Sequence, residues 1–376
     1  MGVPGRLRIR RLLVAAALGA AAVVATAAPA GAHTVGGVNA TNYRTEIRSV
    51  TPATAALTIR AIDNGARLEL TNSGRHDVVV EGYDGEPYLR IGPRGVFENA
   101  RSPARYLNRV LRNPAPPPAS ADPDAPPEWV RVSTGSTARW HDHRTHWMGV
   151  TDPPVVRSAR GEEHLVQRFH LVLHVGDRAV QVRGDVRWIP GPSPWPWIAG
   201  AAVLAIGTVL GARTRRAAAV LATVLVVAVA AAVVHAVGAW TVSSASLGKR
   251  AGDAIPTFGA VALGAVALVQ LRRRGIRAAA PLLVFAGLFL GIAIGLADLS
   301  ALYKSQLPTD LPHALDRLSI AVALGGGLGV AVGAGLHVTD RPAARGAPVG
   351  SPPGSPEGAP DAPPGTENDS HSMMQG

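Results

Sequence analysis

Residues 217–240 read AAAVLATVLVVAVAAAVVHAVGAW, an apolar run in which His235 is the one ionisable side chain. A helix needs about 20 such residues to cross the hydrocarbon core of a bilayer. The run is therefore long enough to be a membrane-spanning helix. The composition of the chain agrees with this prediction, because 47% of its 376 residues are hydrophobic and only 17% are charged. This balance has too few charges for an ordinary soluble enzyme of this length. The sequence therefore predicts a multi-pass protein of the cell membrane.

Four further apolar stretches surround this run, and the first of them is short for a membrane span. Together with 217–240 they predict a bundle of five transmembrane helices within residues 196–340. The four additional stretches are 197–212, 254–271, 278–300 and 318–338.

The distribution of basic residues predicts the orientation of the bundle. Nine of them follow the first, third and fifth apolar stretches: Arg213, Arg215, Arg216, Arg272, Arg273, Arg274, Arg277, Arg341 and Arg345. Four lie in the other loops: Lys249, Arg250, Lys304 and Arg317. Since positive charges favour the cytoplasmic side, residues before the bundle should be extracytoplasmic and the C-terminus should be cytoplasmic.

Two neighbouring stretches carry glycines at a spacing of four, which makes a smooth helix face. These glycines are Gly287, Gly291, Gly295, Gly325, Gly329 and Gly333. Small residues permit close helix packing in lipid, so we expect the helices at 278–300 and 318–338 to pack together. The alternative is that a glycine-rich composition produces such spacings by chance.

Residues 1–32 have the three parts of a secretory signal peptide: basic residues, an apolar stretch from Leu12 to Val24, and the small-residue motif ending at Ala32. Cleavage there makes His33 the first residue of the mature chain. Cleavage after Ala27 and an uncleaved anchor are the alternatives. An exported N-terminal region agrees with the orientation given by the basic residues.

Residues 33–195 contain short alternating runs separated by turn residues, which predicts an extracytoplasmic all-β domain, either an Ig-like or a cupredoxin-like sandwich. The strongest local signal is Asn64-Gly65, which supplies the positive φ of a hairpin between residues 57–60 and 67–70. Two more hairpins are predicted, between 78–80 and 88–91 and between 165–175 and 180–188. In the last one, His170 and His174 should point away from the core.

Two segments are predicted to lie outside these folded regions. Residues 113–127 are rich in proline, which lacks the amide donor that a sheet needs, so they should form a stiff surface loop or a boundary between two subunits of the β-domain. Residues 341–376 are dominated by Pro, Gly, Ala and Ser and should form a disordered cytoplasmic tail.

The composition and the missing motifs exclude several classes of function. The chain has no cysteine, which excludes disulfides, thiolate metal sites and a cysteine nucleophile. Nucleophile elbows, His-Glu-x-x-His motifs and phosphate-binding loops are also missing, so we do not expect an enzyme. The basic residues are nearly all arginines, typical of a high-GC genome, and predict no nucleic-acid partner. The expected partners are the lipid bilayer, a metal ion or an envelope protein.

Histidines concentrate in the exported region, most densely at residues 140–148. On a strand, His141 and His143 share one face with their Cβ atoms about 7 Å apart, close enough to bind one ion. His146 would complete the site if the chain turns after Arg144. The alternative is a polar rim loop with Trp140 and Trp147 packed beneath it.

A mature N-terminal His33 offers an α-amine and an imidazole, which together chelate copper. This arrangement resembles the N-terminal histidine of periplasmic copper-resistance proteins and lytic polysaccharide monooxygenases. The layout is also similar to fused copper-import proteins and to uncharacterised actinobacterial proteins with an exported β-domain and a polytopic bundle. The resemblance implies copper binding for uptake, delivery or sensing. The alternative is an envelope interaction protein whose β-domain binds a protein or polymer and whose helices are an anchor.

The predicted bundle carries a second candidate site, formed by His235, Asp298 and His313. All three should lie near its extracytoplasmic side. Ionisable groups at membrane depth are costly to bury, which marks them as functional candidates. The alternative is that these groups are solvated at the headgroup level.

Overall fold

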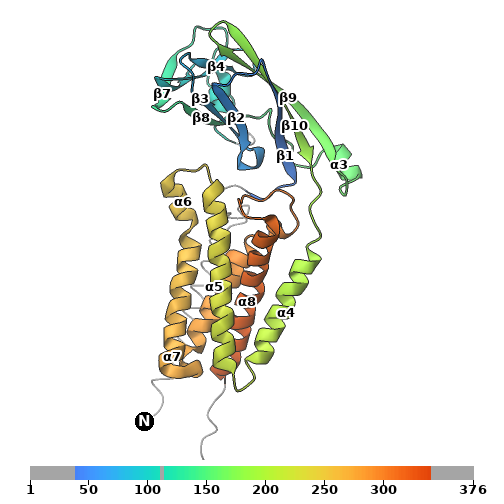
Figure 1. Ribbon diagram of the computed structural model, residues 1–376, viewed down its shortest axis with the longest axis vertical. Helices are drawn as coiled ribbons and strands as arrows, with labels where there is room; N and C mark the ends of the chain where they lie inside the picture. Colours follow the sequence, from blue (N-terminus) through green and yellow to red (C-terminus); the bar gives the residue numbers. More distant parts are fainter. Residues whose placement is uncertain (1–38, 111–113, 340–376) are drawn as a thin grey trace, which may run out of the picture. The chain divides into compact units, whose positions relative to one another are not determined.

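The computed structural model describes residues 39–110 and 114–339, which form a β region followed by a group of helices (Figure 1). The predicted signal peptide, His33 and the tail at 341–376 lie outside the described residues. The main architectural prediction, an N-terminal all-β region before apolar helices, is confirmed.

The β region consists of two antiparallel sheets. The larger has the strand order β1-β10-β9-β4-β5-β6-β7, and the smaller has the order β2-β3-β8. The strands are β1 (Tyr43–Thr51), β2 (Leu57–Ile62), β3 (Arg67–Asn72), β4 (Val78–Glu81), β5 (Pro87–Gly92), β6 (Gly95–Asn99), β7 (Trp129–Ser133), β8 (Thr137–His141), β9 (His164–Val175) and β10 (Arg178–Trp188). Two short helices, α2 (Pro103–Leu107) and α3 (Pro154–Ser158), lie between strands.

The two sheets face each other across one apolar core. Leu68 and Leu70 of the small sheet pack in the same cluster as Leu171 and Val182 of the large sheet, and all four are fully buried. Along each strand these residues alternate with polar ones, as the period of two requires. His170 follows this rule and is exposed on the outer face of β9, as predicted.

All three predicted hairpins are present, as β2–β3, β4–β5 and β9–β10. In the first, Asn64 has φ 55° and Gly65 has φ 86°, the left-handed conformations that this dipeptide accepts readily. Gly65 is needed for a second reason, because a Cβ atom there would lie 2.1 Å from Thr45 Oγ1 of β1. The described part of the proline-rich segment, residues 114–127, forms no strand, as predicted.

The helical part begins at Trp195. Its elements are α4 (Trp195–Gly211), α5 (Ala217–Val242), α6 (Leu247–Asp253), α7 (Ile255–Phe289), the π-helix η2 (Leu290–Leu296), the 3-10 helix η3 (Leu299–Leu302) and α8 (His313–Thr339). Three helical ranges are long and apolar enough to cross a membrane: Ala217–Val242, Ile255–Leu296 and His313–Val338. Helix α4 is apolar but shorter.

The stretches predicted as a third and a fourth helix form one continuous element, α7 with η2, that folds back on itself. Gly275 breaks the helical dihedrals with φ 74° and ψ 177°. A Cβ atom on Gly259 would lie 3.3 Å from the Phe289 ring, although a straight helix would separate these residues by about 45 Å. The two halves of α7 therefore lie side by side.

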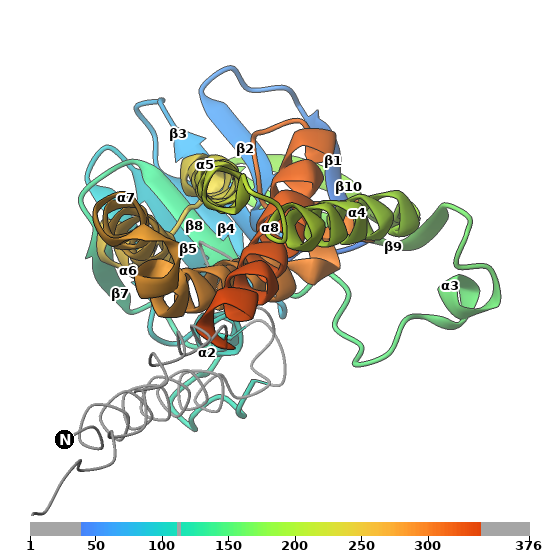
Figure 2. The same ribbon diagram turned by 90° about the horizontal axis from the view of Figure 1, so that it is seen from below.

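Helix α8 contacts α4, α5, α7 and η2, and the end-on view of Figure 2 shows it among them. The predicted direct packing of the two glycine-rich helices is confirmed, because a Cβ on Gly287 would lie 2.5 Å from the Gly327 carbonyl oxygen. The glycines of α8 that face this neighbour are not the predicted ones. Gly325 and Gly329 instead pack closely against the backbone of α4, at Ala201 and Ala205. The spacing of four indicates a smooth face but not which helix covers it.

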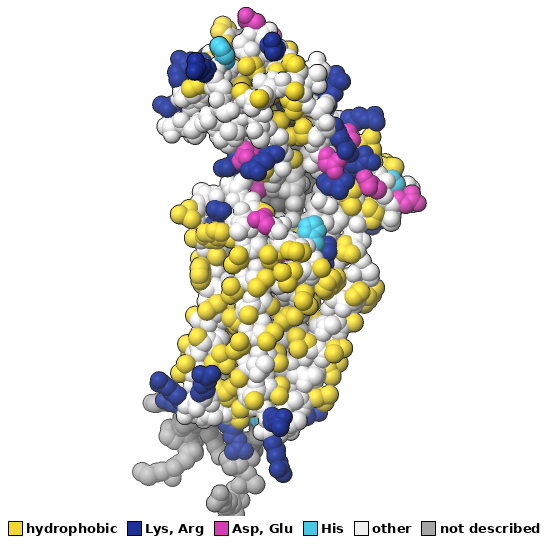
Figure 3. All heavy atoms as spheres, in the orientation of Figure 1, with side chains coloured by type: hydrophobic (Ala, Val, Ile, Leu, Met, Phe, Trp, Pro, Cys, Tyr) yellow, Lys and Arg dark blue, Asp and Glu magenta, His cyan; other side chains and the backbone are white. Residues whose placement is uncertain are grey.

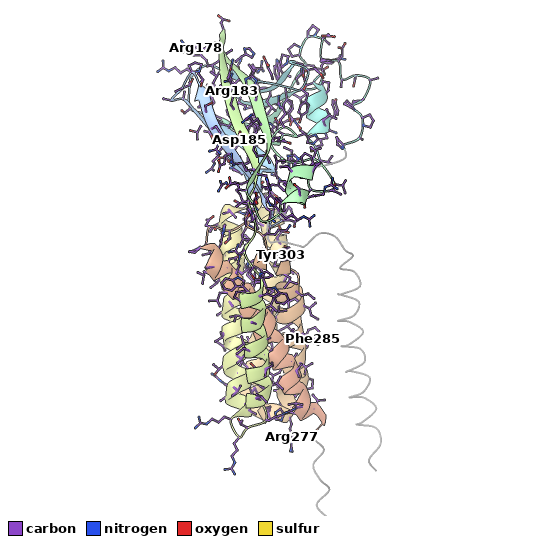
Figure 4. All side chains as sticks on the ribbon, turned by 90° about the vertical axis from the view of Figure 1, so that its right-hand side faces the viewer. Arg178, Arg183, Asp185, Arg277, Phe285 and Tyr303 are labelled. Carbon is purple, nitrogen blue, oxygen red and sulfur yellow. The ribbon has the colours of Figure 1, made fainter. Side chains whose placement is uncertain are left out.

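The surface of the helices is apolar along its length, and lysine and arginine side chains gather at one end (Figure 3). Arg277 lies at that end, and Tyr303 lies at the other (Figure 4). The loop at Tyr303 is joined to the β region by hydrogen bonds. Gln306 and Thr41 exchange two backbone bonds of 2.8 and 2.9 Å, and Ser305 Oγ donates to the Ile189 carbonyl at 2.9 Å.

A Gly325→Leu substitution should destabilise the helices, because a Cβ there would lie 2.2 Å from the Ala201 carbonyl oxygen. We expect a loss of about 1–3 kcal/mol, the usual cost of overpacking. Gly335→Leu in the same helix is the matched control, since a Cβ there meets no atom within 4 Å. Thermal unfolding of both variants in detergent tests the difference, and equal transition temperatures would contradict it.

Glu69→Gln should destabilise the β region. Glu69 is buried between two cross-strand arginines, with its oxygens 2.6 Å from Arg60 Nε and 2.6 Å from Arg139 Nε. Burial raises the pKa of Glu69, but the arginine hydrogen bonds outweigh it and the net pKa is below its usual value. We expect a loss of about 1.5–3 kcal/mol near neutral pH.

A lowered folded-state pKa stabilises the protein above the unfolded pKa of about 4.3, and this stability is lost as pH falls through the folded value. The gap in unfolding temperature between the parent and Glu69→Gln should therefore narrow in acid. The control is Glu162→Gln, because Glu162 is exposed and forms no ion pair within residues 39–110 and 114–339. A gap that is constant with pH would refute the ionic explanation.

Candidate functional site

The histidine-rich segment forms a tight corner after β8. The strand ends at His141, and the Thr145 amide donates to the Asp142 carbonyl at 3.0 Å, which closes a turn. The turn needed to bring His146 back is therefore present. The prediction that His141 and His143 share a strand face is wrong, because the strand stops between them.

Asp142 holds this corner together from a fully buried position. Its carboxylate accepts hydrogen bonds from the Trp140 indole at 3.1 Å and from Arg144 Nε and Nη2, both at 2.8 Å. Arg144 also donates to the carbonyls of Glu81 and Gly82 at the end of β4. The corner is consequently rigid, because a buried ion pair is stable only when its remaining donors and acceptors are satisfied.

His141 is fixed in one tautomer. Its Nδ1 lies 2.8 Å from the Ala66 carbonyl oxygen, which can only accept, so Nδ1 carries the hydrogen. Burial lowers the pKa of His141, which keeps the ring neutral at neutral pH, with a lone pair on Nε2. This is the state in which an imidazole ligates a metal.

His143 and His146 lie beside one another, with ring centroids 5.7 Å apart in an edge-on arrangement. His143 Nε2 is 3.0 Å from the Val110 carbonyl oxygen, and its ring stacks on Tyr83. Its partner in the structure is therefore His146 rather than His141.

His141 and His146 both line a cavity of about 650 Å³. Trp147 and Asp152 also line it, as does the segment from Asn39 to Thr41. His33 lies outside the described residues, but it is only six positions before Asn39, and a chain spans up to about 20 Å over six positions. Among the residues that the structure describes, no three His, Cys, Asp or Glu side chains are grouped to hold a metal ion. A metal site in this cavity thus needs a ligand from beyond them.

The second site lies within the helices. His235 of α5 stands between two aspartates, with Nδ1 2.7 Å from Asp316 Oδ1 and Nε2 3.3 Å from Asp298 Oδ2. All three side chains are buried. The second contact is close enough for an ion pair but lacks hydrogen-bond geometry, so Nε2 has no hydrogen-bond partner among the described residues. Asp298 Oδ1 is likewise buried without one.

The structure brings His235 and Asp298 together, and Asp316 is the third member of the cluster in place of His313. His313 begins α8, and no hydrogen bond or ion pair joins it to His235 within residues 39–110 and 114–339. The residue of α8 that contacts His235 is Asp316, which lies one turn after His313 and was not predicted from the sequence. The available signal was its position in the first turn of an otherwise apolar helix. The next residue, Arg317, is buried and donates to the Ala301 and Lys304 carbonyls.

Comparison of the chain with protein-family models, with curated proteins and with solved structures finds no match in any of the three. The function must accordingly be inferred from the geometry of these two sites.

Proposed function

We propose that the chain is a multi-pass cell-membrane protein whose extracytoplasmic β region binds a metal ion for uptake, delivery or sensing. Copper is the metal that we favour. One observation carries the proposal: His141 and His146 line the same cavity as Asn39, and the chain from Asn39 back to His33 is short enough to bring the N-terminus into it.

The available ligands suit Cu(II). A mature N-terminal His33 would supply two nitrogens, its α-amine and its imidazole. His141 would supply Nε2, because its Nδ1 hydrogen is bonded to Ala66. His146, which lines the same cavity, would add another imidazole. Cu(II) accepts such nitrogen ligands in a square-planar arrangement and binds them more tightly than other divalent first-row ions do.

The proposal includes a cleaved signal peptide and five membrane crossings, with the β region outside and the C-terminus in the cytoplasm. The break at Gly275 supports it, because the two halves of α7 then cross separately. Arg272, Arg273, Arg274 and Arg277 surround that break, where the positive-inside rule expects cytoplasmic residues.

A second candidate function is an envelope interaction protein, and β7 favours it. This strand lies at one edge of the large sheet, and its Val130 and Val132 are 38% and 50% exposed. An open edge with apolar side chains can pair with a strand from a partner protein.

The full chain with its processed N-terminus should bind Cu(II) saturably at micromolar concentration, measured by calorimetry and by quenching of tryptophan fluorescence. Replacing both His141 and His146 with alanine should weaken binding at least tenfold, which is about 1.4 kcal/mol. An extra residue before His33 should weaken it as well. Affinity should fall with pH, because protonated imidazole cannot ligate, and the lowered pKa of His141 moves its loss to lower pH.

His170→Ala is the matched control, since His170 is exposed on the outer face of β9. It should bind copper as the parent does. If no saturable binding occurs, or if both altered forms bind as the parent does, the copper proposal fails and the interaction function takes its place.

The orientation is testable with single cysteines, because the chain has no native cysteine. A membrane-impermeant maleimide should label His170→Cys and Lys249→Cys on intact cells. It should label Arg215→Cys and Arg274→Cys only after permeabilisation. Labelling of either arginine position from outside would contradict the proposed orientation.

A further inference from the structure

The arrangement around His235 leaves a negative charge inside the helices. Nδ1 of the ring is hydrogen-bonded to Asp316 Oδ1, and Nε2 lies 3.3 Å from Asp298 Oδ2, which is an ion-pair distance. An imidazolium between two carboxylates gives these three side chains a net charge of −1. A buried negative charge is costly unless it is paired.

Arg317 follows Asp316 on α8, is buried and carries a positive charge. Its guanidinium donates to the carbonyls of Ala301 and Lys304, and its charge acts on Asp316. His313 lies one turn before Asp316 on the same helix. The side chains of the described residues that form ion pairs with His235 are Asp298 and Asp316 alone.

Asp298 is the member with unused capacity. Asp298 is 5% exposed, and its Oδ1 atom has no hydrogen-bond partner among the residues that the structure describes. Asp316, in contrast, accepts a well-formed hydrogen bond from His235 Nδ1. An incoming proton therefore meets an open lone pair at Asp298.

The backbone before Asp298 is irregular. The π-helix η2 covers Leu290–Leu296, and the Asp298 amide donates to the Ile294 carbonyl at 3.2 Å before the 3-10 helix η3 begins. Short π-helical segments are rare and occur often at functional sites. This second observation, independent of the buried carboxylate, also points to Asp298.

We propose that the Asp298–His235–Asp316 cluster is a proton-binding site. One proton from water adds to the Asp298 carboxylate and forms a carboxylic acid, while His235 remains an imidazolium and Asp316 a carboxylate. The cluster passes from a net charge of −1 to neutral, and release returns the proton to water. The site is separate from the proposed copper site and does not depend on it.

The test uses the full chain in detergent and infrared difference spectra between alkaline and acidic buffer. The parent should gain the carbonyl band of a buried, protonated carboxylic acid, and Asp298→Asn should lose it. Asp310→Asn is the control, because Asp310 is an exposed aspartate in the loop before α8. A parent spectrum without this band, or a band that persists in Asp298→Asn, overturns the proposal.

Stability distinguishes a proton site from a structural ion pair. Asparagine mimics the proton-loaded Asp298, so Asp298→Asn should unfold in alkaline buffer at a temperature equal to or above that of the parent. A lower temperature at every pH overturns the proposal, because an ion pair that is only structural loses stability on neutralisation. An Asp298→Asn chain that fails to fold counts as that outcome.

A metal cation is the other ligand that a buried negative site attracts. The same infrared titration is therefore run in sodium, potassium and choline chloride. The acid band should form at the same pH in all three salts. Suppression of the band by sodium or potassium, with recovery in choline, would assign the site to that ion and overturn the proton proposal.

Discussion

The close approach of backbones around α8 is the constraint on which the helical part depends. Gly287 and Gly327 bring α7 and α8 together at distances that leave no room for a Cβ atom, and Gly325 does the same for α4. In lipid, such packing replaces the hydrophobic force that holds a soluble bundle together. It also fixes where the first turn of α8 lies, and with it the distance between Asp316 and His235.

Both candidate sites depend on the same rule about buried polar groups. In the β region, Asp142 and Arg144 satisfy each other and nearby backbone carbonyls, so that His141 and His146 are presented by a rigid corner. In the helices, Asp316 satisfies one nitrogen of His235, but Asp298 leaves an oxygen without a partner among the described residues. A structural network typically has a hydrogen-bond partner for every buried polar atom. A buried polar atom without a partner marks a group that can still bind a proton or a ligand.

The two proposed sites, one for a copper ion and one for a proton, differ in what the chain supplies. The cavity beside Asn39 is lined by His141, whose ring is held by Ala66, and by His146, and the copper proposal adds nitrogens from residues before Asn39. The cluster in the helices is formed by described residues alone, and one oxygen of Asp298 has no hydrogen-bond partner among them. This difference is why the copper proposal depends on signal cleavage and the proton proposal does not.

The sequence by itself determined the elements whose signal is local. The apolar run at 217–240 identified a helix long enough to cross a membrane. Asn64-Gly65 identified the β2–β3 hairpin, and the alternation in β9 placed His170 outside the core. Each depends on residues within a few positions of one another, where backbone conformation and period decide the outcome.

Only the tertiary structure decided which distant residues meet. Asp316 lies 81 positions from His235. Its place in the first turn of an apolar helix marks it as a candidate but does not indicate which distant side chain it meets. His143 lies beside His146 and not on a strand face with His141, because β8 ends at His141 and the Asp142 carboxylate, in the turn that follows, binds Arg144 and Trp140. The glycine spacing predicted smooth faces but could not choose between α4 and α7 as the neighbour. That choice is made by packing among all the helices at once, since a face of small residues fits any backbone that can approach it.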